Sequence, residues 1–118
     1  MLRAYFAVSV LLFAASASAA ITEAGLVGTW EASAPDMIQI HGKSTITYRA
    51  DHTCTHREYG DYATTGHGTW SLRGGELVSR FGKKLVVRSV VLSVRADQFK
   101  TRGQDGTIFT YTRVKPER

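Results

Sequence analysis

The chain has 118 residues, a formal net charge of +5, and 43% hydrophobic residues, which bounds it to one small domain. Its one cysteine, Cys54, excludes an intramolecular disulfide, so packing must stabilise the fold. Lys and Arg are spread along the chain and are not clustered beside stacking aromatic residues, which argues against nucleic-acid binding.

Residues 1–19 are predicted to be a cleavable signal peptide. A positive start at residues 1–3 precedes an apolar run at 4–15 and a stretch of small residues at 16–20. The run is shorter than the roughly 20 residues that span a bilayer, and no cysteine follows it for lipid attachment. We therefore expect residues 20–118 to form an exported domain, periplasmic or secreted, without a transmembrane anchor.

Beyond this segment, short runs rich in β-branched and aromatic residues alternate with turn signals, as in all-β proteins. The runs predict about eight strands, at 27–33, 43–49, 53–59, 65–72, 76–81, 85–95, 98–102 and 107–114. Residues 22–26 are the one segment predicted to form a helical turn. The polar segment 58–66 is the longest predicted loop.

Short connections between consecutive strands favour an antiparallel up-and-down meander, and closing it into a barrel removes its exposed edges. Closure also protects the apolar run 85–94, which would promote aggregation as an edge strand. The adjacent polar pair Arg88-Ser89 predicts a β-bulge there, after which Val90, Leu92 and Val94 would face inward.

A Gly-x-Trp at the start of the first strand and an Arg near the end of the last resemble the lipocalin (calycin) pattern. More closely, the chain is similar to small bacterial secreted lipocalin-like domains in four motifs: Leu26-Val27-Gly28-Thr29-Trp30, Tyr48 before Asp51-His52-Thr53, Gly68-Thr69-Trp70 and Tyr111-Thr112-Arg113. The resemblance implies a lipocalin-like barrel in which Trp30 closes one end and Arg113 packs across its ring. His52 departs from the pattern, which has Gly there, so a positive φ at this turn would be strained.

Alternation along the predicted strands yields candidate residues for the barrel interior: Tyr48, Cys54, His56, Glu58, Trp70, Phe109 and Tyr111. His52, Cys54 and His56 also suggest a metal site, to which His41 or His67 could add a ligand. If His52 belongs to the turn, however, two ligands on one strand face are too few. We therefore expect no metal and no cofactor. Cys54 is expected to be buried as a small apolar side chain.

The sequence contains no nucleophile, metalloprotease or phosphate-loop motif, so we expect no enzyme activity. The first hypothesis is a monomeric, non-catalytic barrel that binds a small apolar or amphipathic ligand. The alternative is an interaction or structural protein of the cell envelope, with a filled barrel that contacts an unknown partner through its basic surface and loops. An interior volume of several hundred Å³ would favour the first hypothesis.

Overall fold

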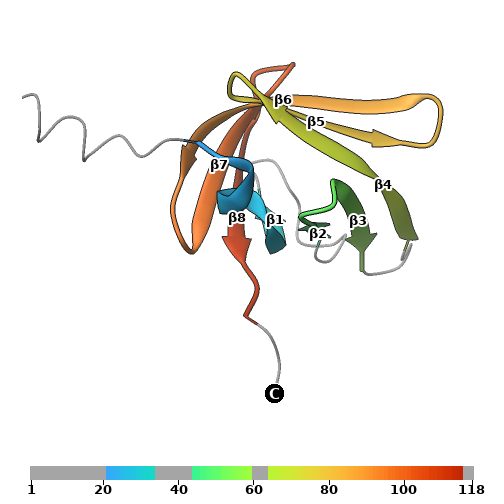
Figure 1. The fold of residues 1–118 in the computed structure, drawn as a ribbon, viewed down its shortest axis with the longest axis horizontal. Helices are drawn as coiled ribbons and strands as arrows, with labels where there is room; N and C mark the ends of the chain where they lie inside the picture. The colour runs from blue at the N-terminus through green and yellow to red at the C-terminus, as the bar shows by residue number, and fades with distance from the viewer. Residues whose placement is uncertain (1–20, 34–43, 60–63, 116–118) are drawn as a thin grey trace, which may run out of the picture.

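A computed structural model describes residues 21–33, 44–59 and 64–115 (Figure 1). The predicted signal peptide, His41 and residues 60–63 of the predicted loop at 58–66 fall outside these ranges, whereas Glu58 and residues 64–66 of that predicted loop belong to strands. Within the described residues, no helix combines the length and the apolar character needed to cross a membrane.

The described residues form one closed barrel in which consecutive strands pair antiparallel and the last strand pairs with the first. This confirms the predicted all-β, up-and-down architecture. The strands are β1 (Gly28–Ser33), β2 (Ser44–Tyr48), β3 (Thr53–Glu58), β4 (Thr64–Arg73), β5 (Glu76–Phe81), β6 (Leu85–Val94), β7 (Gln98–Gly103) and β8 (Ile108–Arg113). A helical turn, α2 (Glu23–Leu26), precedes them, and the Thr22 side chain accepts a hydrogen bond from Gly25 N at 3.3 Å.

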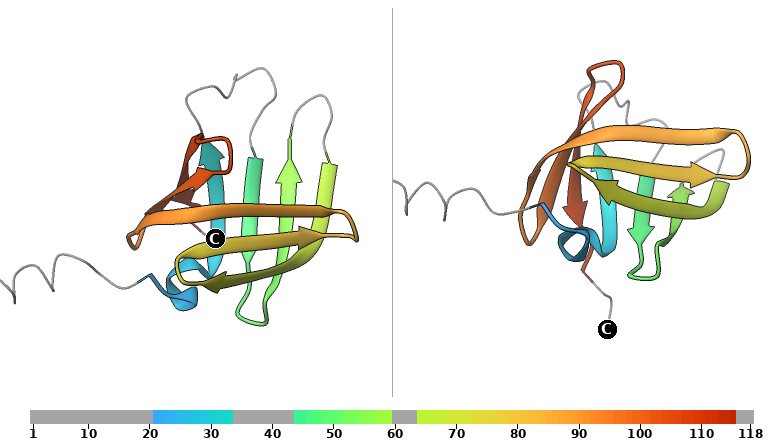
Figure 2. Two further views of the ribbon diagram at one scale, coloured as in Figure 1. Left: turned by 90° about the horizontal axis from the view of Figure 1, so that it is seen from above. Right: turned by 45° about the horizontal axis from the view of Figure 1, so that its top comes forward.

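Up-and-down connectivity gives the barrel two different ends. The β2–β3, β4–β5 and β6–β7 turns lie at the end that also carries α2, which we call the closed end (Figure 2). His52 in the β2–β3 turn contacts Glu23 of α2, with 2.8 Å between Nε2 and Oε1. The other end, the open end, carries the β5–β6 and β7–β8 turns.

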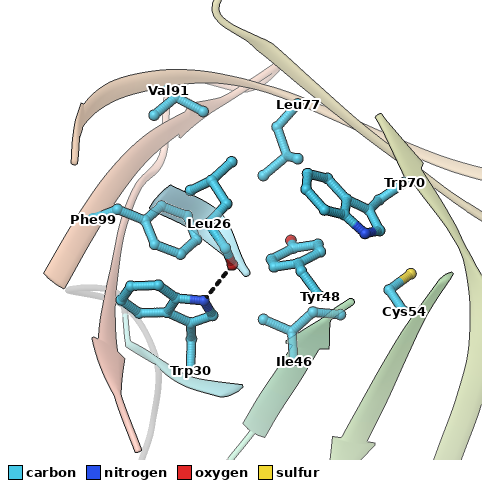
Figure 3. Close-up of a cluster of buried hydrophobic side chains, with 9 residues drawn as sticks. All are labelled: Leu26, Trp30, Ile46, Tyr48, Cys54, Trp70, Leu77, Val91 and Phe99. Atoms are coloured by element: carbon cyan, nitrogen blue, oxygen red, sulfur yellow. Dashed lines mark hydrogen bonds between the residues drawn. The ribbon is translucent and has the colours of Figure 1, made fainter. Parts of the chain in front are cut away.

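The hydrophobic core lies toward the closed end. Leu26, Trp30 and Phe99 are fully buried there, and Trp30 meets Phe99 edge to face with 4.7 Å between ring centroids. The Trp30 Nε1 donates to the Leu26 carbonyl oxygen at 2.8 Å (Figure 3). The ring thereby packs against α2 with its one polar atom satisfied, as buried tryptophan requires.

Arg113 covers the Trp30 ring, with its guanidinium carbon 4.1 Å from the ring centroid. The same guanidinium donates to three carbonyl oxygens, those of Ala96 at 2.6 Å, Val27 at 2.9 Å and Gly25 at 3.4 Å. These carbonyls belong to the β6–β7 turn and to the segment around α2. The Arg113 side chain therefore connects the turn and this segment to β8, the last strand.

The predicted bulge in β6 was wrong in position. The register shifts between Val91 and Ser93, and Val91 is buried while Val90 and Leu92 are each 42% exposed. Arg88 faces outward, where it pairs with Glu76 at 3.3 Å, so the alternation continues through Arg88-Ser89 without a break. Because leucine and valine occur on both faces of this strand, the polarity of its residues does not show which side chains point inward.

The β2–β3 turn carries the one non-glycine positive φ among the described residues, 70° at His52. Asp51 supports the turn, because its Oδ1 accepts from Thr53 N at 3.0 Å and from Thr53 Oγ1 at 2.6 Å. These hydrogen bonds hold the pKa of the Asp51 carboxyl below its ordinary value. The side chain at His52 is thus accommodated in the conformation that glycine ordinarily supplies.

Gly28 has a φ of 138°, and a Cβ built on it would collide with the Arg113 guanidinium. We expect Gly28→Ala to destabilise the protein by about 1–3 kcal/mol in urea unfolding, since it combines backbone strain with displacement of Arg113. Gly66→Ala is the matched control, because its Cβ would meet Phe81 at an ordinary 3.6 Å. Equal stability losses in the two variants would contradict this role for Gly28.

Candidate functional site

A cavity of about 520 Å³ occupies the open half of the barrel. This volume lies within the roughly 300–1,000 Å³ typical of small-molecule sites. The cavity is lined by Ala32, Ser44, Ile46, Tyr48, His56, Glu58, Thr64, Thr65, Gly66, Ser79, Phe81, Leu85, Val87, Phe109 and Tyr111. Most of these side chains are apolar or aromatic.

Strand alternation places the lining residues. Ser44, Ile46 and Tyr48 occupy alternate positions of β2, so their side chains point to one face. Phe109 and Tyr111 do the same on β8. The described lining residues all belong to strands, and strand pairing fixes their positions.

Two glycines on β4 lie against the aromatic wall, and at Gly68 a side chain would crowd it. A Cβ at Gly68 would approach Phe81 Cδ1 to 2.9 Å, and a Cβ at Gly66 would approach the same atom to 3.6 Å. The Phe81 ring consequently lies against bare backbone. His56 contacts the same ring, with 6.3 Å between centroids.

The mouth of the cavity leaves apolar side chains in water. Leu85 and Val87 line the cavity, yet they are 57% and 47% exposed. Both lie on the β5–β6 hairpin, which extends away from α2 in Figure 1. Exposed apolar surface inside a concavity is a feature of binding sites, since a bound ligand removes it from water.

Two tyrosines lie at the inner part of the cavity. Burial raises the pKa of Tyr48 far above its ordinary value, and nearby Tyr111 raises it further, while a hydrogen bond with Ser79 acts in the opposite direction. Burial also raises the pKa of Tyr111. Both hydroxyls therefore stay neutral at physiological pH and can offer hydrogen bonds without charge.

Thr101 is a buried polar residue beside this region. It is fully buried, and it lies near enough to Tyr111 to lower the pKa of that hydroxyl. No described residue meets its Oγ1 at hydrogen-bonding geometry. Thr101 thus places a buried hydroxyl beside Tyr111, outside the residues that line the cavity.

Three polar groups of the lining form a cluster on β2 and β3. The Ser44 Oγ and the His56 Nε2 are 2.8 Å apart, and the Glu58 Oε1 is 3.9 Å from the same nitrogen. Ser44 and Glu58 are register partners on adjacent strands at the rim. One side of the mouth is therefore polar and acidic.

Serine beside histidine is also the pairing used by hydrolases. In that chemistry a third group orients the imidazole through its other nitrogen, and donors stabilise an oxyanion. Here Glu58 approaches the nitrogen that already contacts Ser44, so it does not orient the ring for proton transfer. The described arrangement suits ligand contact better than nucleophilic attack.

Five of the seven residues predicted for the interior line the cavity: Tyr48, His56, Glu58, Phe109 and Tyr111. The other two, Cys54 and Trp70, lie in the core next to Tyr48, with Trp70 5.1 Å from Tyr48 between centroids. Among the lining residues that were not predicted, Phe81, Leu85 and Val87 form the apolar wall on β5 and β6. The alternation of Leu77, Ser79 and Phe81 along β5, continued across the turn, was a signal that could have found them.

The residues considered for metal binding are separated. His52 lies in the turn against Trp70, Cys54 is in the core, and His56 faces the cavity. His67 contacts Thr55, with 3.2 Å between Nδ1 and Oγ1. In the described ranges no three His, Cys, Asp or Glu side chains converge to hold a metal ion.

Cys54 is 1% exposed, and burial raises the pKa of its thiol, although the charge of Arg49 acts against this shift. We expect the folded protein to react with a thiol reagent such as Ellman's reagent far more slowly than the urea-unfolded protein does. Equal rates in the two states would show that the thiol is accessible.

Comparisons with known proteins leave the family open: no protein-family model matches the chain, and no curated protein matches it.

Proposed function

We propose that the protein is an exported, lipocalin-like binding protein that holds a small apolar or amphipathic molecule in its barrel without catalysis. The cavity of about 520 Å³ carries this proposal. Its lining combines aliphatic and aromatic side chains with hydroxyl groups, one histidine and one carboxylate, which matches the general character of small-molecule sites.

Two further observations support it. Leu85 and Val87 expose apolar surface to the cavity mouth, so a ligand that covers them gains the free energy of removing this surface from water. Membership of the lipocalin family is proposed because of the Gly28-Thr29-Trp30 motif and Arg113. The guanidinium of Arg113 covers the tryptophan ring in an eight-stranded barrel.

Titration with the uncharged fluorophore N-phenyl-1-naphthylamine tests the proposal. We expect saturable binding with one site per chain and a rise in melting temperature with ligand concentration, because a ligand of the native state stabilises it by mass action. Absence of both saturable fluorescence and thermal stabilisation across a panel of neutral apolar compounds would contradict it.

The alternative is an envelope protein that acts through its basic outer surface and loops. That hypothesis called for a filled barrel, and the cavity does not support it. Recovery of an envelope partner by a variant with a blocked cavity would favour this alternative.

A further inference from the structure

The charges of this protein are distributed unequally between the two faces of the barrel wall. Lys and Arg number 15 against 10 Asp and Glu in the whole chain. The described residues that line the cavity nevertheless include one carboxylate, Glu58, and neither Lys nor Arg. This arrangement repels a carboxylate ligand at Glu58 and attracts a cation there.

Strand alternation explains this separation. Arg57 precedes Glu58 on β3, and Arg80 lies between Ser79 and Phe81 on β5. Both arginines are exposed and occupy the positions that alternate with cavity-lining residues. The basic side chains therefore project from the outer face, and the acidic one belongs to the inner face.

Glu58 is placed to meet a ligand. Its side chain is 54% exposed at the mouth, and its Oε1 is 3.9 Å from His56 Nε2, which is too long for a hydrogen bond. The His56 Nε2 is already engaged at 2.8 Å by Ser44. The carboxylate thus lies at the entrance and accepts no hydrogen bond from His56.

The aromatic side chains of the lining can contact both the charged group and the hydrocarbon chain of an amphipathic cation. Phe81, Phe109 and Tyr111 line the cavity with Glu58. Aromatic faces attract cations within about 6 Å of the ring centroid, and aromatic and aliphatic side chains also bury a hydrocarbon chain.

We propose that the cavity selects amphipathic amines, with the protonated nitrogen at Glu58 and the apolar chain packed among Ile46, Phe81 and Val87. The inference rests on the proposed ligand-binding function and specifies the ligand class. The net charge of the protein opposes a cation at long range, but salt screens that repulsion beyond about 8 Å, whereas contact with Glu58 is screened less.

The test compares three ligands with the same ten-carbon chain: decylamine, decanol and decanoate. The affinity of each ligand is measured from its displacement of N-phenyl-1-naphthylamine from the purified protein at neutral pH and moderate salt. We expect decylamine to bind about tenfold or more tightly than decanoate, with decanol between them. Glu58→Gln should reduce this preference to less than about threefold, since both the attraction and the repulsion disappear.

Glu76→Gln is the matched control, because it removes the same charge from the outer face, where Glu76 pairs with Arg88. It should retain the preference for decylamine. Melting temperatures of both variants establish that they are folded.

The outcomes separate the two proposals. If all three ligands bind equally, or if decanoate binds most tightly, the selectivity for amines is wrong and the binding function stands. If the parent protein prefers decanoate and the double variant Lys83→Ala/Lys84→Ala loses that preference, lysines of the β5–β6 turn determine the selectivity. The inference is then likewise overturned. If none of the three ligands displaces the fluorophore and the fluorophore itself does not bind, the proposed function fails.

Discussion

Trp30→Ala is expected to lower the free energy of unfolding by about 3–5 kcal/mol, the range for truncation of a fully buried large aromatic residue. Trp30 is 0% exposed, packs edge to face on Phe99 and lies beneath Arg113. Its loss leaves a cavity at the closed end and removes the ring that Arg113 covers. Urea unfolding monitored by circular dichroism measures the change.

The loss is a large fraction of the roughly 5–15 kcal/mol that stabilises a typical domain. Trp30→Phe is the control, because it keeps an aromatic ring beneath Arg113 and loses the hydrogen bond from Nε1 to the Leu26 carbonyl. It should cost markedly less than Trp30→Ala. A Trp30→Ala variant as stable as the parent protein would show that this residue does not seal the barrel.

Gly66→Phe is expected to weaken binding of N-phenyl-1-naphthylamine at least tenfold, about 1.4 kcal/mol, while leaving the protein folded. Gly66 lines the cavity, and its backbone has no positive φ that would forbid a side chain. A Cβ at this position meets Phe81 of the cavity lining at 3.6 Å, so we expect the new ring to occupy space in the cavity. The melting temperature should change by less than about 8 °C, equivalent to about 1 kcal/mol in a domain of this size.

Thr110→Phe is the matched control for this variant. Thr110 alternates with Phe109 and Tyr111, which line the cavity, so a ring at residue 110 lies on the outer face. It should bind the fluorophore as the parent protein does. Equal affinity in all three proteins would place the fluorophore outside the cavity.

The strand positions followed from the sequence because β-branched and aromatic residues alternate between clear turn signals. The β6 strand is the exception in detail. Val90, Val91 and Leu92 are all apolar, so polarity could not reveal which of them faces inward. Pairing with β7 and the register shift after Val91 decide it, and these are tertiary properties.

Alternation identifies the face of a side chain but not its depth in the barrel. Cys54 and His56 both point inward from β3, yet register places Cys54 beside Tyr48 in the core and His56 beside Ile46 in the cavity wall. Trp70 lies deep for the same reason. The contact between Ser44 and His56 required two strands to be aligned, and sequence spacing alone carried no sign of it.

The location of a bound ligand tests the central claim most directly, and β6 contains its own controls. Methyl NMR spectra of the protein titrated with decanol should show shifts and intermolecular contacts at Leu85 and Val87, which line the cavity. The methyl groups of Val90 and Leu92, exposed and outside the cavity lining, should remain unchanged. Contacts confined to Val90 and Leu92, with none at Leu85 and Val87, would contradict a ligand-binding barrel.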